Sequence, residues 1–421
     1  MGEQQNYLWN GILKTINEFS NEECRKVEEI KLSIKRQKQR YLEACLRTAT
    51  KRYLLDIVKK LIEEENVDPN AEDSNGTSPV MIAAGQGDVH TLEFLLSLSD
   101  KVNTNSKDNN GWTPLHYACS KGHEAIVSFL LGLEDIQVKV NINATSKNGM
   151  TPLHLACSEG FEEVVRVLLG HPQIMVNRGG NTGDTPLLNA CSRGHEAIVS
   201  LLLNQEDIQV NKSNNNMDTA LMVACNESNA GIVRLLLSRD DINVNAQNAY
   251  KSSALMRACC KGNIEIVKSL LDHKDIDVNL EDCSRATALM WACDKEHIDV
   301  IPLLLQREDL KRTLKNVRTI VRLVMDEVVD QDTYKVTKKA VIEKAVSKNL
   351  PDIARWLLKI EGYLASACTG STALTGSTAE VRGHRPVRKR KRQPGFPARK
   401  TKRVAKRVRK NPKRESRENV I

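Results

Sequence analysis

The sequence predicts an all-α solenoid, an array of helix-turn-helix repeats joined by hairpin-like loops, capped at both ends and followed by a disordered basic C-terminal tail. Two observations carry this prediction. A short motif returns seven times along the middle of the chain, at intervals of 34 to 38 residues, and apolar residues follow each copy at helical spacing. Aromatic residues make up 4% of the 421 residues, which suits thin layers of aliphatic side chains better than one large globular core.

The clearest copy of the motif spans residues 111–131. Thr113 and Pro114 signal a helix start, because a threonine can cap a helix and a proline at its first position gives up no hydrogen bond. Gly122 ends that helix, and a second apolar run follows it. Helices this short are marginal alone, so each must stack on its neighbours and extend one continuous core.

The seven copies begin at a threonine or a serine. They start at Ser78, Thr113, Thr151, Thr185, Thr219, Ser253 and Thr287. A period near 33 residues with the pattern T-P-L-H-x-A is the signature of ankyrin repeats, and the chain resembles that family over residues 40–305. The resemblance implies a concave surface, formed by the hairpin tips and the exposed side of the first helices, that binds other proteins.

The repeats divide the chain into five parts. Residues 1–40 are expected to form a helical N-terminal extension, with a coiled-coil or partner-binding helix as the alternative. Residues 41–305 hold the repeats, including a degenerate first unit that serves as the N-terminal cap. Residues 306–362 are expected to form an inserted helix and a C-terminal capping repeat. A Gly/Ser/Thr linker at 363–381 then leads to the basic disordered tail at 382–421.

The last three copies depart from the pattern, with Ala in place of Pro and Met in place of His. They also lack the glycine that precedes the motif, since Met217, Lys251 and Arg285 stand there, which leaves the turn geometry open. The loops between repeats share the form Asp-Ile-x-Val-Asn, in which the asparagine suits a turn with positive φ. The longer connection at residues 138–143 is expected to project as a finger.

Charge is divided unevenly along the chain. The formal net charge is +9, but residues 382–421 alone carry +16, which leaves −7 on the rest. A mildly acidic solenoid argues against direct wrapping of nucleic acid. The start of the chain lacks the features of a secretion signal, and no apolar run is long enough to span a membrane. These features predict a nuclear and/or cytoplasmic protein without a membrane partner.

Six of the eleven cysteines occupy one position of the repeat. They are Cys119, Cys157, Cys191, Cys225, Cys259 and Cys293. Copies of one position on packed helices lie about 8–10 Å apart, beyond the reach of a disulfide of about 7 Å between Cα atoms. The cysteines are therefore predicted to be small buried apolar residues, and neither a metal nor a cofactor is expected.

A catalytic role finds little support in the sequence. Cys119 and His123, like Cys191 and His195, are four residues apart, but the equivalent histidine position in another copy holds Phe161. A position that accepts phenylalanine is structural. No phosphate loop, dinucleotide fingerprint, HExxH or paired-cysteine zinc spacing is present, so the chain is predicted not to be an enzyme.

Binding on the concave face is the favoured function. Trp112, Met150 and Tyr250 are the expected anchors, because exposed aromatic side chains on a rigid platform tend to dominate interface energetics. Ordinary turn chemistry and packing is the alternative for the same positions, and Trp291 is expected in the core. The further candidates on this face are Asn109, Asn110, Lys121, Arg193 and Lys261.

Two basic blocks in the tail indicate a nuclear-localisation signal that an import receptor would bind, or a patch for polyanions. The residues concerned are Arg388, Lys389, Arg390, Lys391, Arg392, Lys402, Arg403, Lys406 and Arg407. The sequence thus predicts a non-catalytic scaffold or adaptor with a nuclear-localisation signal. The alternative is an adaptor whose tail tethers chromatin or RNA, although the tail offers Phe396 alone for base stacking.

Overall fold

A computed structural model of the chain describes residues 24–98, 101–132, 140–311, 316, 319–320, 323–324, 338–348 and 350–359. The chain divides into two units, Met1–Ser371 and Thr372–Ile421, and every described residue belongs to the first. Helices are the regular elements there, and the described ranges contain no strand. The all-α prediction is confirmed for this part of the chain.

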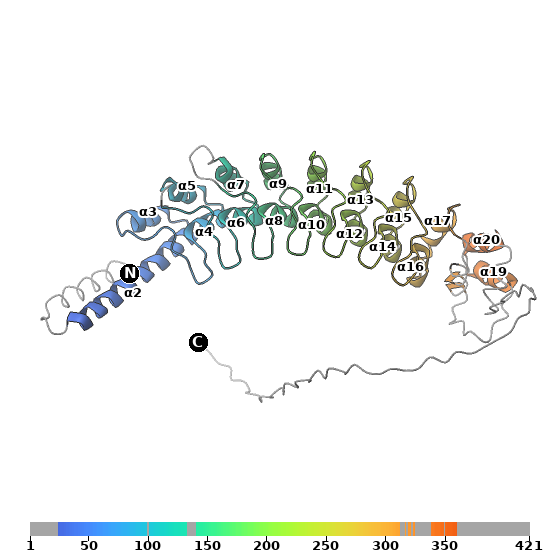
Figure 1. Cartoon of the computed structure of the whole chain (residues 1–421), viewed down its shortest axis with the longest axis horizontal. Coiled ribbons are helices and arrows are strands. Elements are labelled where there is room, and N and C mark those ends of the chain that lie inside the picture. The colour runs from blue at the N-terminus through green and yellow to red at the C-terminus, as the bar shows by residue number, and fades with distance from the viewer. Residues whose placement is uncertain are drawn as a thin grey trace, which may run out of the picture. The chain divides into compact units, whose positions relative to one another are not determined.

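The repeats form two rows of short helices (Figure 1). The first helices are α4 (Pro79–Gln86), α6 (Pro114–Lys121), α8 (Pro152–Glu159), α10 (Pro186–Arg193), α12 (Ala220–Asn226), α14 (Ala254–Lys261) and α16 (Ala288–Asp294). The second helices are α5 (Val89–Ser97), α7 (Glu124–Leu131), α9 (Glu162–Leu169), α11 (Glu196–Leu203), α13 (Ala230–Leu237), α15 (Ile264–Leu271) and α17 (Ile301–Leu305). Each of these helices packs on its own partner, adjacent first helices pack on one another, and the second helices from α7 to α17 pack on their neighbours in the same way.

The boundaries of a first helix follow from its terminal residues. In α8, Thr151 is the N-cap with an extended backbone, and its hydroxyl accepts from the backbone N–H of His154. Pro152 occupies the first turn, where its missing N–H costs nothing. Gly160 ends the helix at a φ of +86°, a left-handed conformation that favours glycine. The threonine and glycine signals in the sequence are therefore used as expected.

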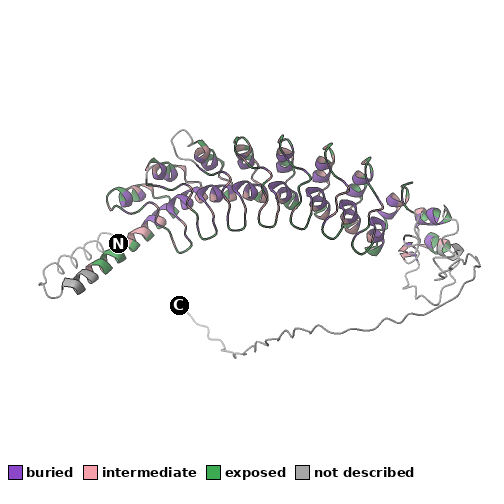
Figure 2. Cartoon of the chain, viewed as in Figure 1, coloured by how far each residue is buried: buried purple, intermediate pink, exposed green. Residues whose placement is uncertain are grey.

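The core runs as a continuous band between the two rows of helices (Figure 2). The repeated cysteine position lies within it, and the described cysteines are all free. The six predicted positions are buried: Cys119, Cys157, Cys191, Cys225, Cys259 and Cys293. Burial raises the pKa of their thiols, to about 12 for Cys225 and Cys293. The prediction of buried, unpaired thiols is confirmed.

A buried histidine joins successive repeats at the start of α8. The Nδ1 atom of His154 accepts from the backbone N–H of Thr151 at 3.1 Å, and its Nε2 donates to the carbonyl of Asp184 in the next repeat at 3.0 Å. His116 makes the same pair of contacts with Thr113 and Met150. Both rings are fully buried, and burial lowers the pKa of each histidine to about 4.

The asparagine of the Asp-Ile-x-Val-Asn loop connects one repeat to the next. Asn211 donates from Nδ2 to the carbonyl of Asp241 at 2.6 Å, and its Oδ1 accepts from the backbone N–H of Asn243 at 2.7 Å. Asn177, Asn245 and Asn279 make equivalent pairs of bonds. None of these asparagines has a positive φ, so the expected role in turn geometry is wrong. The side chain serves as a two-bond clamp on a neighbouring loop.

The turns before the first helices keep one geometry with and without glycine. Gly111, Gly149 and Gly183 have φ values of +77°, +74° and +80°. Met217, Lys251 and Arg285, which replace the glycine, have φ values of +61°, +56° and +58°. A side chain in this region costs about 1–2 kcal/mol. The turn that the sequence left open is therefore the same turn, held at a conformational cost.

Side-chain hydrogen bonds explain how such a strained turn is held. Before α14, Oδ1 of Asn248 accepts from the backbone N–H of Tyr250 at 3.0 Å and of Ser252 at 2.9 Å. The N–H of Lys251 donates to the carbonyl of Asn248 at 2.8 Å. These three bonds fix the turn around Lys251 whatever the residue at its centre.

The N-terminal cap begins with one long helix. Helix α2 (Cys24–Lys51) continues from the extension into the position of a first helix, and α3 (Leu55–Glu63) follows as the second. Leu46 is fully buried at the end of α2 that contacts α4, whereas Leu32 is 51% exposed at the other end. The described part of the extension and the first helix of the cap thus form a single element.

At the other end, α19 (Lys338–Ser347) and α20 (Pro351–Lys359) pack together, and α20 contacts α17. Ile353 and Leu357 of α20 are buried. Most of the expected inserted helix lies outside the described residues. The few described positions within it are helical and include the buried Ile320 and Val324. Of the expected projecting finger at 138–143, only residues 138–139 lie outside the described residues. Val140 and Ile142 are buried, so this part of the connection packs on the stack and the expectation that it projects is wrong.

The buried histidines make stability depend on pH. A histidine with a pKa of about 4 in the folded state and about 6.5 unfolded stabilises the protein fully above pH 6.5. That contribution falls as the pH drops from 6.5 towards 4, by about 2 kcal/mol at pH 5 for one histidine. We therefore expect the wild type to lose more stability between pH 7 and pH 5 than His154→Leu, in urea unfolding. Leucine is chosen because Leu188 occupies the equivalent buried position. Equal losses in the two proteins would contradict the assignment.

The glycine turns predict a second effect. A Cβ atom on Gly149 would lie 2.5 Å from Oδ1 and 2.7 Å from the backbone nitrogen of Asn181, in a residue with positive φ. Gly149→Ala should therefore destabilise by about 2 kcal/mol or more in urea unfolding. Lys251→Ala is the matched control, because Lys251 already holds a Cβ at the equivalent position. It should change stability by less than about 0.5 kcal/mol, and similar losses in both variants would refute the explanation.

Candidate functional site

The turns and the first helices share one surface, which we call the inner face. It consists of the residues around each N-cap, from the turn to the outward-facing positions of α6, α8, α10, α12, α14 and α16. Figure 1 shows these turns on the concave side of the stack within the first unit. Single backbone hydrogen bonds of 2.8–3.0 Å connect the turns of adjacent repeats, so the face is rigid.

Trp112 belongs to a packed aromatic cluster on the inner face. Its ring lies 5.3 Å from that of Tyr117 in an edge arrangement and 6.3 Å from that of His116. The hydroxyl of Tyr117 donates to Oδ2 of the buried Asp108 at 2.8 Å, and burial raises the pKa of Tyr117 to about 12. Trp112 is half-buried by these contacts. It therefore combines a packing role with a partly exposed ring.

Tyr250 is the more exposed of the predicted anchors. Its side chain is 68% exposed, while its backbone carbonyl accepts from the N–H of Cys283 in the next turn at 3.0 Å. Met150 is half-buried, and its carbonyl accepts from Nε2 of His116 at 3.1 Å. In both residues the backbone carbonyl accepts a hydrogen bond from an adjacent repeat, and the side chain takes no part in that bond. The ring of Tyr250 remains available to a partner.

The turn asparagines contribute to stacking. The backbone N–H of Asn109 donates to the carbonyl of Asn75 at 2.8 Å, and its Nδ2 donates to the carbonyl of Ser74 at 3.0 Å. The carbonyl of Asn110 accepts from the N–H of Lys147 at 2.8 Å. Both side chains are exposed, so these residues combine the turn role with a place on the inner face.

The three predicted basic residues are exposed but separate. Lys121, Arg193 and Lys261 end α6, α10 and α14. Helices α8 and α12 lie between them, and the equivalent positions there are the exposed Glu159 and Glu227. Basic and acidic residues thus alternate along this part of the face, and the structure does not gather the three into one patch.

A polar network on the inner face was missed from the sequence. Oδ1 of Asp218 accepts from Arg257 at 2.6 Å and from Nδ2 of Asn248 at 2.8 Å, and both charged side chains are largely buried. Asp184 accepts from Asn214 in the same way at 2.7 Å. The sequence did contain a signal for this network, because an aspartate stands immediately before two successive N-cap threonines, at Asp184 and Asp218.

Trp291 lies at the edge of the core. It is half-buried, its Nε1 donates to Oδ2 of Asp282 at 3.0 Å, and the ammonium of Lys295 lies 6.0 Å from its ring centroid. The residue therefore packs against the core and also contributes to the inner face. Tyr117 occupies the same repeat position and contacts Asp108 in the same way.

The cysteine–histidine pairs have a structural use. Nε2 of His123 donates to the carbonyl of Gly85, and Nε2 of His195 donates to that of Ser158, each at 3.1 Å in the preceding repeat. Burial raises the pKa of the Cys191 thiol, which opposes formation of a nucleophilic thiolate. The histidines connect repeats, as the sequence comparison between copies indicated.

The described ranges hold neither a metal-binding cluster nor a membrane-spanning helix. No group of three or more His, Cys, Asp or Glu side chains there could hold a metal ion. Nor does any helix of this part of the chain have the length and apolar character to cross a membrane. The basic residues predicted in the tail lie outside the described residues.

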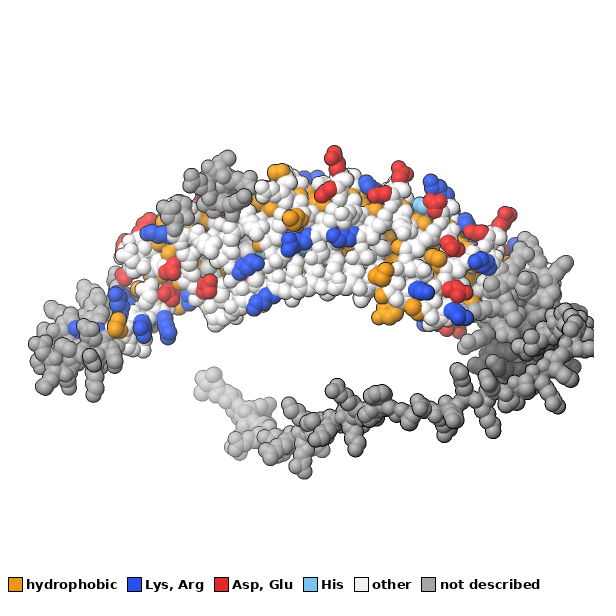
Figure 3. All heavy atoms as spheres, in the orientation of Figure 1, with side chains coloured by type: hydrophobic (Ala, Val, Ile, Leu, Met, Phe, Trp, Pro, Cys, Tyr) orange, Lys and Arg blue, Asp and Glu red, His pale blue; other side chains and the backbone are white. Residues whose placement is uncertain are grey.

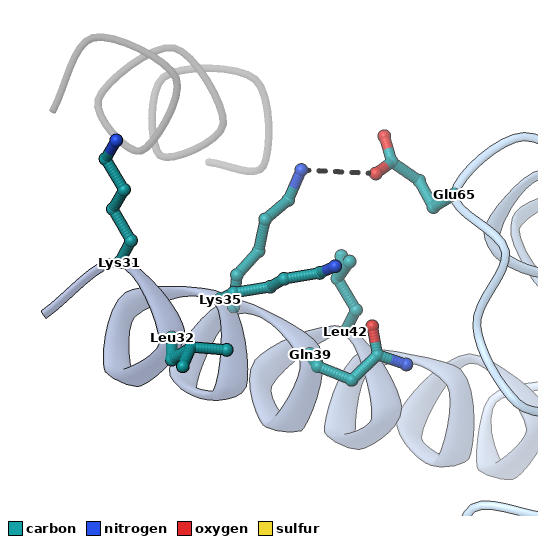
Figure 4. Close-up of a pocket in the computed structure, with 7 residues that line it drawn as sticks. Lys31, Leu32, Lys35, Gln39, Leu42 and Glu65 are labelled. Atoms are coloured by element: carbon teal, nitrogen blue, oxygen red, sulfur yellow. Dashed lines mark ion pairs between the residues drawn. The ribbon is translucent and has the colours of Figure 1, made fainter. Parts of the chain in front are cut away.

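A hollow of about 490 Å³ lies beside α2 (Figure 4). Its lining residues are Lys31, Leu32, Lys35, Lys38, Gln39, Leu42 and Glu65. The ammonium of Lys38 lies 3.5 Å from Oε2 of Glu65, and both side chains remain partly exposed. The hollow is open and adjoins the N-terminal cap, away from the inner face.

Comparisons with known proteins place the fold. A model of ankyrin repeats in three copies matches residues 46–144, 102–178, 133–214, 173–248 and 241–314. Solved structures that match include the ankyrin repeat domain of Bcl-3, described as a unique member of the IkappaB protein family. It is 27% identical, with a TM-score of 0.48, over 54% of this chain and 99% of that one. A search of curated proteins gave no match.

The overlapping matches to the family model run without a break from residue 46 to residue 314. They cover both helices of every repeat described above, and the resemblance predicted over residues 40–305 covers nearly all of this span. Since this is well over half of the chain, the protein belongs to the ankyrin-repeat family.

Proposed function

We propose that this protein is a non-catalytic adaptor that binds a protein partner on its inner face and enters the nucleus through its basic tail. Ankyrin repeats are protein-interaction modules, so the scaffold role follows from the family. The observation that carries the choice of surface is the 68% exposed ring of Tyr250 on a turn fixed by hydrogen bonds. Large aromatic side chains on preorganised backbone are favoured as interface anchors.

The inner face supports this role in two further ways. Its turns are connected by backbone bonds, so little conformational entropy is lost when a partner binds. Trp112 adds a second, half-buried aromatic surface several repeats away. A partner that contacts both would lie across the repeats of α6 to α14.

The tail supports the nuclear part of the proposal by its charge of +16 in residues 382–421. The alternative is that the same tail tethers the adaptor to chromatin or RNA. Binding to phosphate weakens steeply with added salt, whereas a protein interface on the inner face responds less. Retention of the protein on nucleic acid at low salt, with release at moderate salt, would favour the tether.

Tyr250→Ala should reduce capture of the partner by the full-length protein from a cell extract. Truncation of a central aromatic anchor costs about 2 kcal/mol or more, equivalent to a loss of about 30-fold in affinity. The melting temperature should stay unchanged, because the side chain is mostly exposed. Trp112→Ala should lower both capture and stability, since its ring also packs on Tyr117.

The control for this measurement is Met175→Ala. Met175 is a 52% exposed apolar residue in the loop after α9, away from the inner face. It should leave capture and melting temperature unchanged. Capture that is insensitive to Tyr250→Ala, or equally sensitive to Met175→Ala, would reject the inner face as the binding surface.

The second expectation concerns location. Replacing Lys389, Arg390, Lys391 and Arg392 with alanine should abolish most nuclear accumulation of a tagged full-length protein, because a receptor reads a defined basic block. Non-specific polyanion binding should fall partly, since these are four of the tail's 18 basic residues. The measurement is the nuclear-to-cytoplasmic ratio beside the wild type. Equal ratios would reject a signal centred on this block and leave the tether as the explanation of the tail.

A further inference from the structure

Three successive turns on the inner face carry side chains in a conformation that favours glycine. The turns before α6, α8 and α10 have glycine there, at φ values of +74° to +80°. The turns before α12, α14 and α16 have Met217, Lys251 and Arg285 at +56° to +61°. Glycine would relieve this strain without altering the turn, so the turn geometry itself does not require the larger side chains.

The three strained residues lie in one row. The N–H of Ala249 donates to the carbonyl of Asn216 at 2.9 Å, and that of Cys283 to the carbonyl of Tyr250 at 3.0 Å. These bonds place the turns of Met217, Lys251 and Arg285 next to each other, with Tyr250 among them. We call Met217, Tyr250, Lys251 and Arg285 the turn row. Figure 3 shows hydrophobic and basic side chains, with acidic ones among them, along the lower edge of the last repeats.

The turn row combines apolar surface with positive charge. Met217 is 53% exposed and Tyr250 is 68% exposed. Lys251 is exposed beside them, and Lys261 is exposed at the end of α14, the helix that this turn precedes. Among the described residues, neither lysine has an acidic partner within ion-pair distance.

The nearby carboxylates of the described residues form no ion pair with these lysines. Asp218 is paired with Arg257 at 2.6 Å, and Asp282 is buried, where it caps its own turn and accepts from Trp291. Glu227 and Glu281 are exposed in the flanking repeats. Lys251 shares the turn of Tyr250, and Lys261 lies at the other end of the helix that follows, and both ammonium groups remain open to carboxylates of another molecule.

We propose that the turn row, with Lys261, binds an acidic, extended segment of the protein partner. Carboxylates of that segment contact the ammonium groups of Lys251 and Lys261, and an apolar side chain packs on Tyr250 and Met217. This inference rests on the proposed function and adds the chemistry of the partner. Charge complementarity on an exposed surface directs the approach, and the apolar contact supplies most of the affinity.

The test uses a synthetic peptide of about 12 residues, long enough when extended to cross three repeats about 10 Å apart. It contains alternating glutamates, two leucines and one photo-reactive phenylalanine analogue, and it is cross-linked to the full-length protein. Mass spectrometry locates the cross-links, so attachment to the basic tail is distinguished from attachment to the turn row. We expect cross-links in the turns before α12, α14 and α16. A peptide with lysine in place of glutamate should give none there.

The decisive variant is the triple replacement Met217→Gly, Lys251→Gly and Arg285→Gly. It should raise the melting temperature, because strain is relieved, and reduce turn-row cross-links by about tenfold. Lys261→Glu should also reduce them. Lys268→Glu, an exposed lysine on the second helix α15 of the same repeat, is the matched control and should leave them unchanged. Cross-links to the tail should persist in every variant.

Three results would overturn the inference: cross-links confined to the tail, turn-row cross-links that survive the triple replacement, or a lower melting temperature of that variant. None of these affects the capture measured with Tyr250→Ala. A partner captured through Tyr250 whose own cross-links are insensitive to the triple replacement would keep the proposed function and reject the acidic segment. Loss of the Tyr250 effect would instead reject the proposed function.

Discussion

Every helix of the array depends on contact with the next repeat, because helices of five to nine residues do not persist alone in water. Contacts between adjacent repeats occur in the core, at the turns and in the loops. Small buried residues let the first helices approach closely, His116 and His154 bond to the following turn, and asparagines such as Asn211 clamp the loops. Function is consequently confined to positions that these contacts leave exposed. The inner face is such a set of positions, and its rigidity is a by-product of the stacking.

Much of the fold could be predicted because the signals were local. Thr151, Pro152 and Gly160 each act within one turn of helix, so their residue types were informative alone. Asn211 was misread because its partners lie 30 and 32 residues away and belong to another repeat. The turn at Lys251 was left open because its geometry is set by the side chain of Asn248, three residues earlier, and not by the residue at its centre.

The sequence predicted which residues lie on the inner face, but it did not predict how exposed their side chains are or how charge is distributed among them. Repeat register placed Trp112 and Tyr250 on one face, but their exposure depends on neighbours that register does not describe. Trp112 lies against Tyr117, whereas the turn of Tyr250 offers its ring no such support. Likewise, Lys121, Arg193 and Lys261 share a repeat position, yet acidic residues on the helices between them divide the charge. The exposure of each side chain and the separation of the charged residues are set by side-chain packing between repeats.

The column of buried cysteines has a practical consequence for the dynamics of the array. A thiol reacts with alkylating reagents as the thiolate, and burial raises the pKa of Cys119, Cys191 and Cys259 well above the ordinary value. Each sulfur is therefore protected until its own repeat opens. Since one such cysteine lies in each first helix from α6 to α16, the rate at which each is alkylated reports the opening free energy of a single repeat. The protein thus carries a built-in probe of local unfolding, spaced one repeat apart.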